Sequence, residues 1–214
     1  KKTEIPDFTS LNINLEDSDL NIEESPNEKS YIEYAQATKD KKNPVSYSIE
    51  NGTLTLKEAG NTGASYYINV DISFLQAALS SKNIEDYTKE SSKYENYVTL
   101  YLPKDKLVSS AKIYLGYGDF YVKNATFDTT NIKLDDGDFN ANTLTANSGK
   151  LTFSYGDCDL QKASLGNISL TSKDGDLTVN ELTLSGKTKI ALSYGDTEIK
   201  LESGGLSATV PWNY

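Results

Sequence analysis

The dipeptide Gly-Asp recurs five times in the second half of the chain at an almost constant spacing. Successive copies lie 19, 19, 19 and 20 residues apart. The glycines, which we expect to form structural turns, are Gly118, Gly137, Gly156, Gly175 and Gly195. A fixed period near 20 residues is typical of a solenoid, in which each repeat buries its apolar face against the next. This repeat constrains the fold more than any other feature of the chain.

Apolar residues recur as three pairs within each repeat. Around the first two Gly-Asp steps the pairs are Phe120 with Val122, Ala125 with Phe127, and Ile132 with Leu134. Within each pair, one polar residue separates the two apolar ones, as in a short strand with one face turned inward. The pattern therefore predicts an all-β fold, a single-stranded β-helix (β-solenoid) with three short strands per turn of about 19 residues. Cys158 falls on an inward position, and we expect a buried thiol there.

The Gly-Asp pairs allow two interpretations. In the structural one, glycine takes a positive φ at the corner and the aspartate carboxylate accepts backbone N–H bonds in the turn. In the functional one, the stacked carboxylates form a cation-binding ladder; its members would be Asp119, Asp138, Asp157, Asp176 and Asp196. The structural interpretation is favoured because calcium-binding solenoids supply several acidic residues in each short repeat. The position before glycine alternates between tyrosine and aspartate, which keeps acidic side chains apart.

The chain divides into a less regular and a regular part within one continuous domain. Residues 1–110 are expected to form irregular N-terminal turns with an insertion at 73–96, and residues 111–205 the regular Gly-Asp turns. In the first part, Ser18-Asp19 stands where Gly-Asp would, and Asn51-Gly52 stands at a similar corner between apolar pairs. Residues 206–214, which include Trp212, are expected to cap the open end of the solenoid.

Composition excludes several function classes. The chain has 21 Lys plus Arg, all of them lysine, against 31 Asp plus Glu, no histidine and one cysteine. Without histidine there is no imidazole base or histidine metal ligand. A net charge of −10 disfavours nucleic acid and anionic membranes as partners. No apolar run is long enough to span a membrane. We therefore expect no enzyme, no cofactor and no membrane insertion by this segment.

Three segments carry a resemblance to a known family. They are the alternating strands between Ile13 and Ile22, the strand and proline of residues 98–103, and Ala111-Lys112-Ile113 running into the Gly-Asp turns. Together they resemble the bacterial putative-adhesin domain family, whose function is unknown. The resemblance implies an exported β-solenoid on the extracytoplasmic side and supplies no catalytic residues. The chain departs from the pattern at 73–96 and at Asn51-Gly52-Thr53, which lacks aspartate.

Two classes of function remain open. The first is a non-catalytic cell-surface or secreted module, adhesin-like or scaffolding, which docks an envelope protein or a glycan through its solenoid faces. The second is a polysaccharide-active or carbohydrate-binding β-helix protein. The candidate interaction surface consists of Tyr114, Tyr117, Tyr121, Tyr155 and Tyr194. The chain opens on Lys1-Lys2-Thr3-Glu4 with no apolar leader, which we expect of a mature, exported chain. We expect a monomer.

Overall fold

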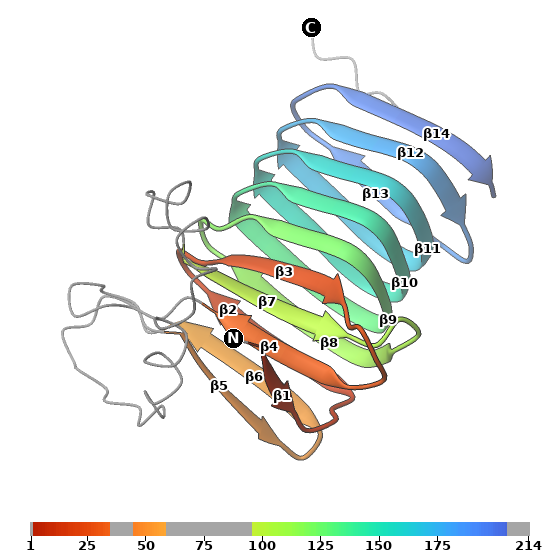
Figure 1. The fold of residues 1–214 in the computed structure, drawn as a ribbon. Helices are drawn as coiled ribbons and strands as arrows, with labels where there is room; N and C mark the ends of the chain where they lie inside the picture. The colour runs from red at the N-terminus through yellow and green to blue at the C-terminus, as the bar shows by residue number, and fades with distance from the viewer. Residues whose placement is uncertain (1, 35–44, 59–95, 205–214) are drawn as a thin grey trace, which may run out of the picture.

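The computed structural model describes residues 2–34, 45–58 and 96–204, and these residues form strands stacked along one axis (Figure 1). The strands are β1 (Thr3–Ile5), β2 (Ser10–Leu15), β3 (Asp19–Glu24), β4 (Ser30–Tyr34), β5 (Val45–Glu50), β6 (Thr53–Glu58), β7 (Tyr97–Leu102), β8 (Leu107–Leu115), β9 (Phe120–Asp136), β10 (Phe139–Tyr155), β11 (Cys158–Asp174), β12 (Leu177–Leu184), β13 (Lys189–Leu192) and β14 (Thr197–Ser203). Over these ranges there is no helix that could cross a bilayer.

The regular turns confirm the predicted solenoid. Strands β9, β10 and β11 pair in parallel with a constant shift of 19 residues, so that Phe139 lies between Phe120 and Cys158. The three short strands expected in each turn are the inward-facing segments of one 17-residue strand. Between two of these segments, two adjacent residues both face outward, such as Asp128 and Thr129. After them the alternation of inward and outward side chains is shifted by one residue. The three long strands run through these bends and end at the Gly-Asp steps.

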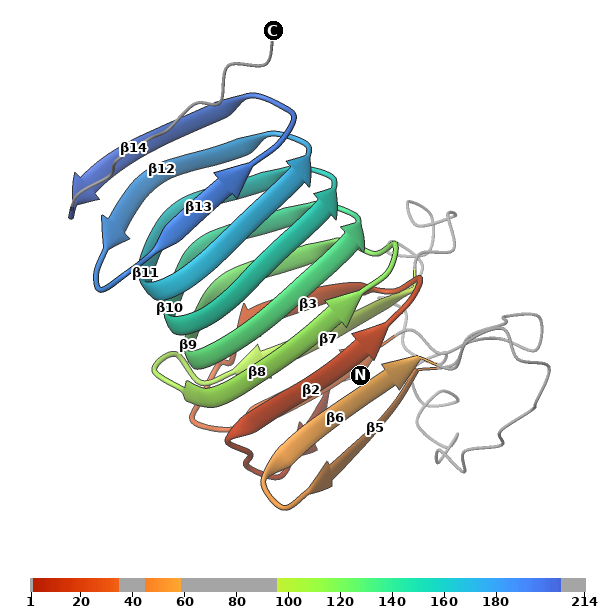
Figure 2. The ribbon, with the colours of Figure 1, turned by 180° about the vertical axis from the view of Figure 1, so that it is seen from behind.

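The pairings arrange the strands into two faces that the long strands join. One face has the order β1-β4-β7-β3-β9-β10-β11-β12-β14. On the other face the pairings run β5-β6-β2-β8-β9-β10-β11-β13, as Figure 2 shows from behind. Each of β9, β10 and β11 contributes its first residues to one face and its last residues to the other. The Gly-Asp steps therefore lie where the chain passes between the two faces.

The stacking order differs from the chain order at the N-terminal end. Strand β2 pairs with both β6 and β8, and β3 pairs with both β7 and β9. The first turn of the chain is therefore inserted between two later segments. Asp19 stands in the corner position expected from the sequence, because Leu20 pairs with Phe120. The end of the stack beyond this turn is closed by antiparallel strands β1, β4 and β5.

The prediction of a solenoid corner at Asn51-Gly52 is wrong. Strands β5 and β6 form an antiparallel hairpin, and Asn51 and Gly52 have φ values of 50° and 73°. Two positive φ values in a two-residue loop are what a hairpin turn of the mirror-image type requires, and Asn-Gly satisfies them at low cost. The predicted insertion at 73–96 lies outside the described residues except for Asn96, and so does the predicted cap at 206–214.

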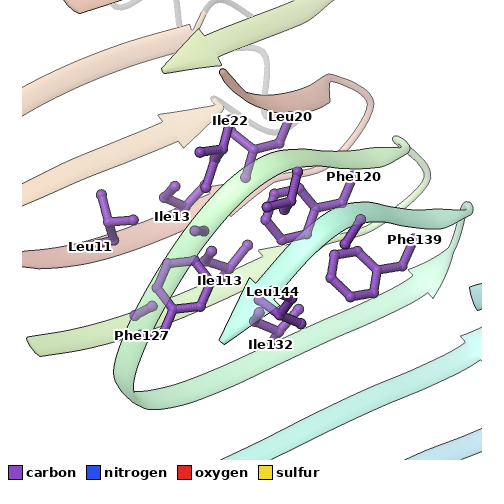
Figure 3. Close-up of a cluster of buried hydrophobic side chains, with 14 of the residues drawn as sticks. Leu11, Ile13, Leu20, Ile22, Ile113, Phe120, Phe127, Ile132, Phe139 and Leu144 are labelled. Atoms are coloured by element: carbon purple, nitrogen blue, oxygen red, sulfur yellow. The ribbon is translucent and has the colours of Figure 1, made fainter. Parts of the chain in front are cut away.

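Inward side chains form one continuous apolar core along the stack. Phe139 of β10 lies between Phe120 of the preceding turn and Phe153 of its own turn, with ring centroids 5.1 and 5.2 Å apart. Figure 3 shows Phe120 and Phe139 beside aliphatic side chains from neighbouring turns. Cys158 is buried in this core, as the sequence predicts. The core fixes the rungs relative to one another, which makes the corners a rigid row of equivalent positions.

Candidate functional site: the Gly-Asp edge

The corners of successive turns form a continuous edge along the solenoid. We call this the Gly-Asp edge, and it consists of residues 117–119, 136–138, 155–157, 174–176 and 194–196. Each corner joins the end of one strand to the start of the next; Gly137 and Asp138, for example, connect β9 to β10. Equivalent residues in parallel neighbouring strands lie about 4.8 Å apart. The edge therefore presents a column of glycines between two columns of side chains at a regular spacing.

The aspartates of the edge form a hydrogen-bond ladder between turns. Each backbone N–H of this column donates to the carboxylate Oδ1 of the aspartate one turn earlier, at distances between 2.7 and 2.8 Å. The successive donors are Asp119, Asp138, Asp157, Asp176 and Asp196, and Asp19 supplies the first acceptor. Hydrogen bonds to a carboxylate are stronger than neutral ones. The ladder therefore stabilises the stacking of the corners.

The glycine column is enforced by close approach between turns. Gly137, Gly156, Gly175 and Gly195 have φ values between 99° and 135°. A Cβ atom built on Gly156 would overlap the carbonyl oxygen of Gly137, and the same overlap recurs at each turn. Gly118 has a φ outside the left-handed region, and a side chain there is excluded by the close backbone of Ser18 and Asp19. A side chain in this column would push neighbouring turns apart.

The cation-ladder hypothesis stays a prediction. Within the described ranges, no group of three or more histidine, cysteine, aspartate or glutamate side chains is arranged to hold a metal ion. One oxygen of each acceptor carboxylate already receives a backbone N–H. The ladder differs from the turn-local bonding that the sequence suggested, because the donor belongs to the next turn.

Three of the five predicted tyrosines lie together on the edge. Tyr117, Tyr155 and Tyr194 are 69%, 60% and 74% exposed, and they are the three most exposed large apolar or aromatic side chains in the described part of the chain. They occupy one column, with exposed Asp136 and Asp174 in the turns between them. Tyrosines two turns apart are separated by about 10 Å. The column therefore offers aromatic rings at a regular interval with carboxylates between them.

The other two predicted tyrosines flank the edge on opposite faces. Tyr114 in β8 is half-buried and donates a hydrogen bond of 2.9 Å to Asp135 Oδ2. Burial, followed by this bond, raises the pKa of Tyr114 to about 12. Tyr121 in β9 accepts a hydrogen bond of 2.9 Å from the amide of Asn142. Both hydroxyls take part in bonds within the protein, so these residues belong to the solenoid faces.

A buried glutamate closes the N-terminal end of the edge, and sequence reasoning missed it. Glu58, at the end of β6, is 7% exposed. Its Oε2 accepts the backbone N–H groups of Glu16, Asp17 and Ser18 at 2.8, 2.9 and 3.2 Å, and its Oε1 accepts the Ser18 hydroxyl at 2.8 Å. Glu58 therefore satisfies the backbone donors of the corner between β2 and β3. No local pattern marks it, because its partners lie about 40 residues earlier in the chain.

The edge presents aromatic faces and carboxylates on a fixed backbone. Cys158, the one thiol in the chain, lies in the core. Burial raises the pKa of the Cys158 thiol well above its ordinary value, which disfavours the reactive thiolate. The exposed columns can stack on apolar or sugar surfaces and can pair with cations or hydrogen-bond donors.

Comparisons with known proteins found a matching family model and several similar crystal structures. The family model described as Toastrack DUF4097 matches residues 8–210. A crystal structure described as a putative cell adhesion protein from Clostridium sporogenes ATCC 15579 is similar over 94% of this chain and 98% of that chain, with 13% identity and a TM-score of 0.45. A second, described as a putative adhesin from Bacteroides fragilis NCTC 9343, is similar over 92% of this chain and 95% of that chain, with 11% identity and a TM-score of 0.37. No curated protein matches the chain.

The family match spans nearly all of the chain and confirms the resemblance that the sequence motifs carry. The protein belongs to the Toastrack DUF4097 family.

Proposed function

We propose that the protein is a non-catalytic, extracytoplasmic module of the cell surface that docks an envelope protein or a glycan along the Gly-Asp edge. The observation that carries this proposal is the column of exposed tyrosines at positions 117, 155 and 194. Large aromatic side chains usually lie at least partly buried, so three in one exposed column on a rigid scaffold indicate a contact surface.

The architecture favours an extended partner. The tyrosines repeat every second turn, and the intervening aspartates offer acceptors to a hydroxyl or a cation. A partner that runs along the solenoid axis would meet the same set of groups at each double turn. Because the scaffold is held by ladders on both faces, binding would require little ordering of the protein.

The proposal is tested by measuring adhesion with matched variants. Beads coated with the wild-type chain should be retained on an array of immobilised glycans or on isolated bacterial envelope. Replacing Tyr117, Tyr155 and Tyr194 together with serine should abolish most of that retention. The matched control replaces three exposed residues of one column on the β8–β9–β10 face: Lys112→Ser, Asn131→Ser and Lys150→Ser.

The control variant should be retained like the wild type. Equal retention of the tyrosine variant and the wild type would contradict docking through the edge. Absence of wild-type retention on both surfaces would contradict the adhesin-like role. The location is tested separately, because a surface module of intact cells is removed by added protease and a cytoplasmic one is not.

The second candidate, a carbohydrate-active or carbohydrate-binding β-helix protein, shares the glycan as partner. The tyrosine column favours its binding form, since aromatic rings stack on sugars. Retention on glycans without release of reducing ends from the same polysaccharides would support binding. Release of reducing ends by the wild type would support the enzyme instead.

A further inference from the structure

The net charge of −10 is distributed unevenly over the solenoid. One face, which Figure 2 shows from behind, is built by residues 110–114, 129–135, 148–154, 167–173 and 189–193. Its charged residues are one aspartate and five lysines, and we call it the lysine face; the lysines are Lys112, Lys133, Lys150, Lys173 and Lys189. Charges more than about 8 Å away are screened at physiological salt, so a partner on this face meets its lysines rather than the net charge.

Four of these lysines have no carboxylate partner in the part of the chain that the structure describes. Lys133 is the exception, because its Nζ lies 2.6 Å from Asp135 Oδ1. On the opposite face, between β3 and β14, the lysines are paired; Lys123 Nζ, for example, lies 3.5 Å from Glu23 Oε2. The lysine face therefore carries positive charge that these parts of the protein do not neutralise.

Three of the unpaired lysines stand in one column, at every second turn. The column runs from Lys112 through Asn131, Lys150 and Ser169 to Lys189, and each residue pairs in register with the next. Neighbouring strands lie about 4.8 Å apart, so the lysines recur about every 10 Å. The neutral residues between them prevent repulsion between lysines on adjacent strands. The column is thus a row of positive charges whose spacing is fixed by the stacking of the turns.

The neutral residues of this face indicate which kind of anion it fits. Amide and hydroxyl side chains lie between and beside the lysines; they include Asn131, Ser169, Thr152 and Thr171. These groups both donate and accept hydrogen bonds, and so do the hydroxyls of a sugar. A glycan supplies hydroxyls along its whole length, whereas a polyphosphate chain supplies acceptors alone. The combination of lysines with amides and hydroxyls therefore favours a glycan that carries negative charge.

We propose that the lysine face binds a linear anionic polysaccharide that lies along the solenoid axis, with its carboxylate groups on Lys112, Lys150 and Lys189. This binding goes beyond the proposed docking function, because it uses a different surface and a partner selected by its negative charge. The stacked strands hold the row of lysines in place before the partner arrives, so the backbone needs little ordering.

Polygalacturonate, a linear polymer of sugar acids, is the probe that tests the proposal. The fluorescein-labelled polymer should bind the wild type in 50 mM salt, measured by fluorescence anisotropy, and the affinity should fall at least about tenfold by 200 mM salt, because ion contacts release counterions. Replacing Lys112, Lys150 and Lys189 together with glutamine should lower the affinity at low salt at least about tenfold. The matched control removes three lysines elsewhere and has the same net charge; it carries Lys123→Gln, Lys162→Gln and Lys200→Gln.

The control should bind the polymer like the wild type. Absence of wild-type binding at low salt would overturn the proposal. An equal loss in the control would also overturn it, because only the net charge would then matter. Asn131→Ala combined with Ser169→Ala should weaken binding of polygalacturonate and leave binding of inorganic polyphosphate unchanged. The same result for both polymers would overturn the assignment to a glycan.

A second measurement needs no variant. Bound polygalacturonate should protect Lys112, Lys150 and Lys189 from acetylation by acetic anhydride, which mass spectrometry measures for each lysine. Lys123 and Lys200 should be acetylated as in the free protein. Protection of both sets alike, or of neither, would overturn the proposal.

Salt separates this binding from docking through the Gly-Asp edge. At 1 M salt the Debye length is about 3 Å, so the lysine face no longer holds a polyanion. Retention in that salt reports the edge, and the control variant of the retention experiment is compared with the wild type there. At low salt the triple tyrosine variant should still bind polygalacturonate. Loss of that binding would place the anionic polymer on the edge, which would overturn this proposal and leave the docking proposal standing.

Discussion

Replacing Glu58 with alanine should destabilise the protein strongly although Glu58 lies far from the regular repeats. Its carboxylate accepts three backbone N–H bonds and one hydroxyl bond in a buried site. At about 1 kcal/mol net for each bond, the loss is about 4 kcal/mol. With a urea dependence of about 2 kcal/mol per M, the midpoint of unfolding should fall by about 2 M.

Two further variants separate the hydrogen bonds from general effects. Glu58→Gln keeps a carbonyl oxygen for the three N–H groups but loses the charge and replaces the acceptor of the Ser18 hydroxyl with an NH2 group, so we expect a smaller loss of about 1–2 kcal/mol. Glu50→Ala alters an exposed glutamate of the neighbouring strand β5 and should change the unfolding free energy by less than about 0.5 kcal/mol. The reasoning is refuted if urea unfolding shows Glu58→Ala to be as stable as Glu50→Ala.

Two other substitutions test the core and the flank of the edge. Thr130 is 1% exposed, and its Oγ1 has no hydrogen-bond partner among the described residues. Thr130→Val should therefore raise the free energy of unfolding, measured in urea, by about 1 kcal/mol. Thr129→Val, at an exposed position, should not raise it in this way. Hydrogen bonds from Lys133 and Tyr114 hold the pKa of Asp135 below its ordinary value. The ionised carboxylate therefore stabilises the fold fully above the pKa that Asp135 has in the unfolded chain. This stabilisation is lost as the pH falls through the lower pKa that Asp135 has in the folded protein. Asp135→Asn should therefore be less stable than the wild type at neutral pH by at most about 1 kcal/mol, and acid unfolding curves should show the difference shrinking as the pH falls below the unfolded pKa of about 3.9.

The regular turns were predictable because each repeats the same local pattern. In β9, β10 and β11, the spacing of glycine and of apolar pairs determines both the period and the inward columns. Parallel in-register stacking then follows, since only that arrangement places apolar residues over apolar residues. The exposed tyrosine column could also be anticipated, because its position relative to Gly-Asp is constant.

The N-terminal part was less predictable because its contacts join residues distant in the chain. Local alternation identifies β2 and β3 as strands. It cannot show that β2 inserts between β6 and β8, or that β3 inserts between β7 and β9. Likewise, Asn51-Gly52 suits a corner or a hairpin equally well by apolar pattern, and its two positive φ values decide for the hairpin. The cap formed by Glu58 depends on donors that only this stacking order brings near.

The direction of the aspartate bonds was also beyond local reasoning. An aspartate after glycine can accept from its own turn or from a neighbouring one. In the structure the carboxylate accepts its bond from the neighbouring turn. The spacing between turns places the backbone nitrogen of Asp138, for example, 2.8 Å from Oδ1 of Asp119. Interactions between turns are invisible in a single repeat.

Oxidative footprinting of the bound protein tests the central claim, that the tyrosine column of the Gly-Asp edge is the docking surface. Hydroxyl radicals modify exposed side chains, and mass spectrometry measures the modification of each one with and without isolated envelope or the retained glycan. We predict that Tyr117, Tyr155 and Tyr194 become protected while exposed Leu107 is modified as before. Unchanged modification of the three tyrosines in protein that is demonstrably bound would contradict the claim.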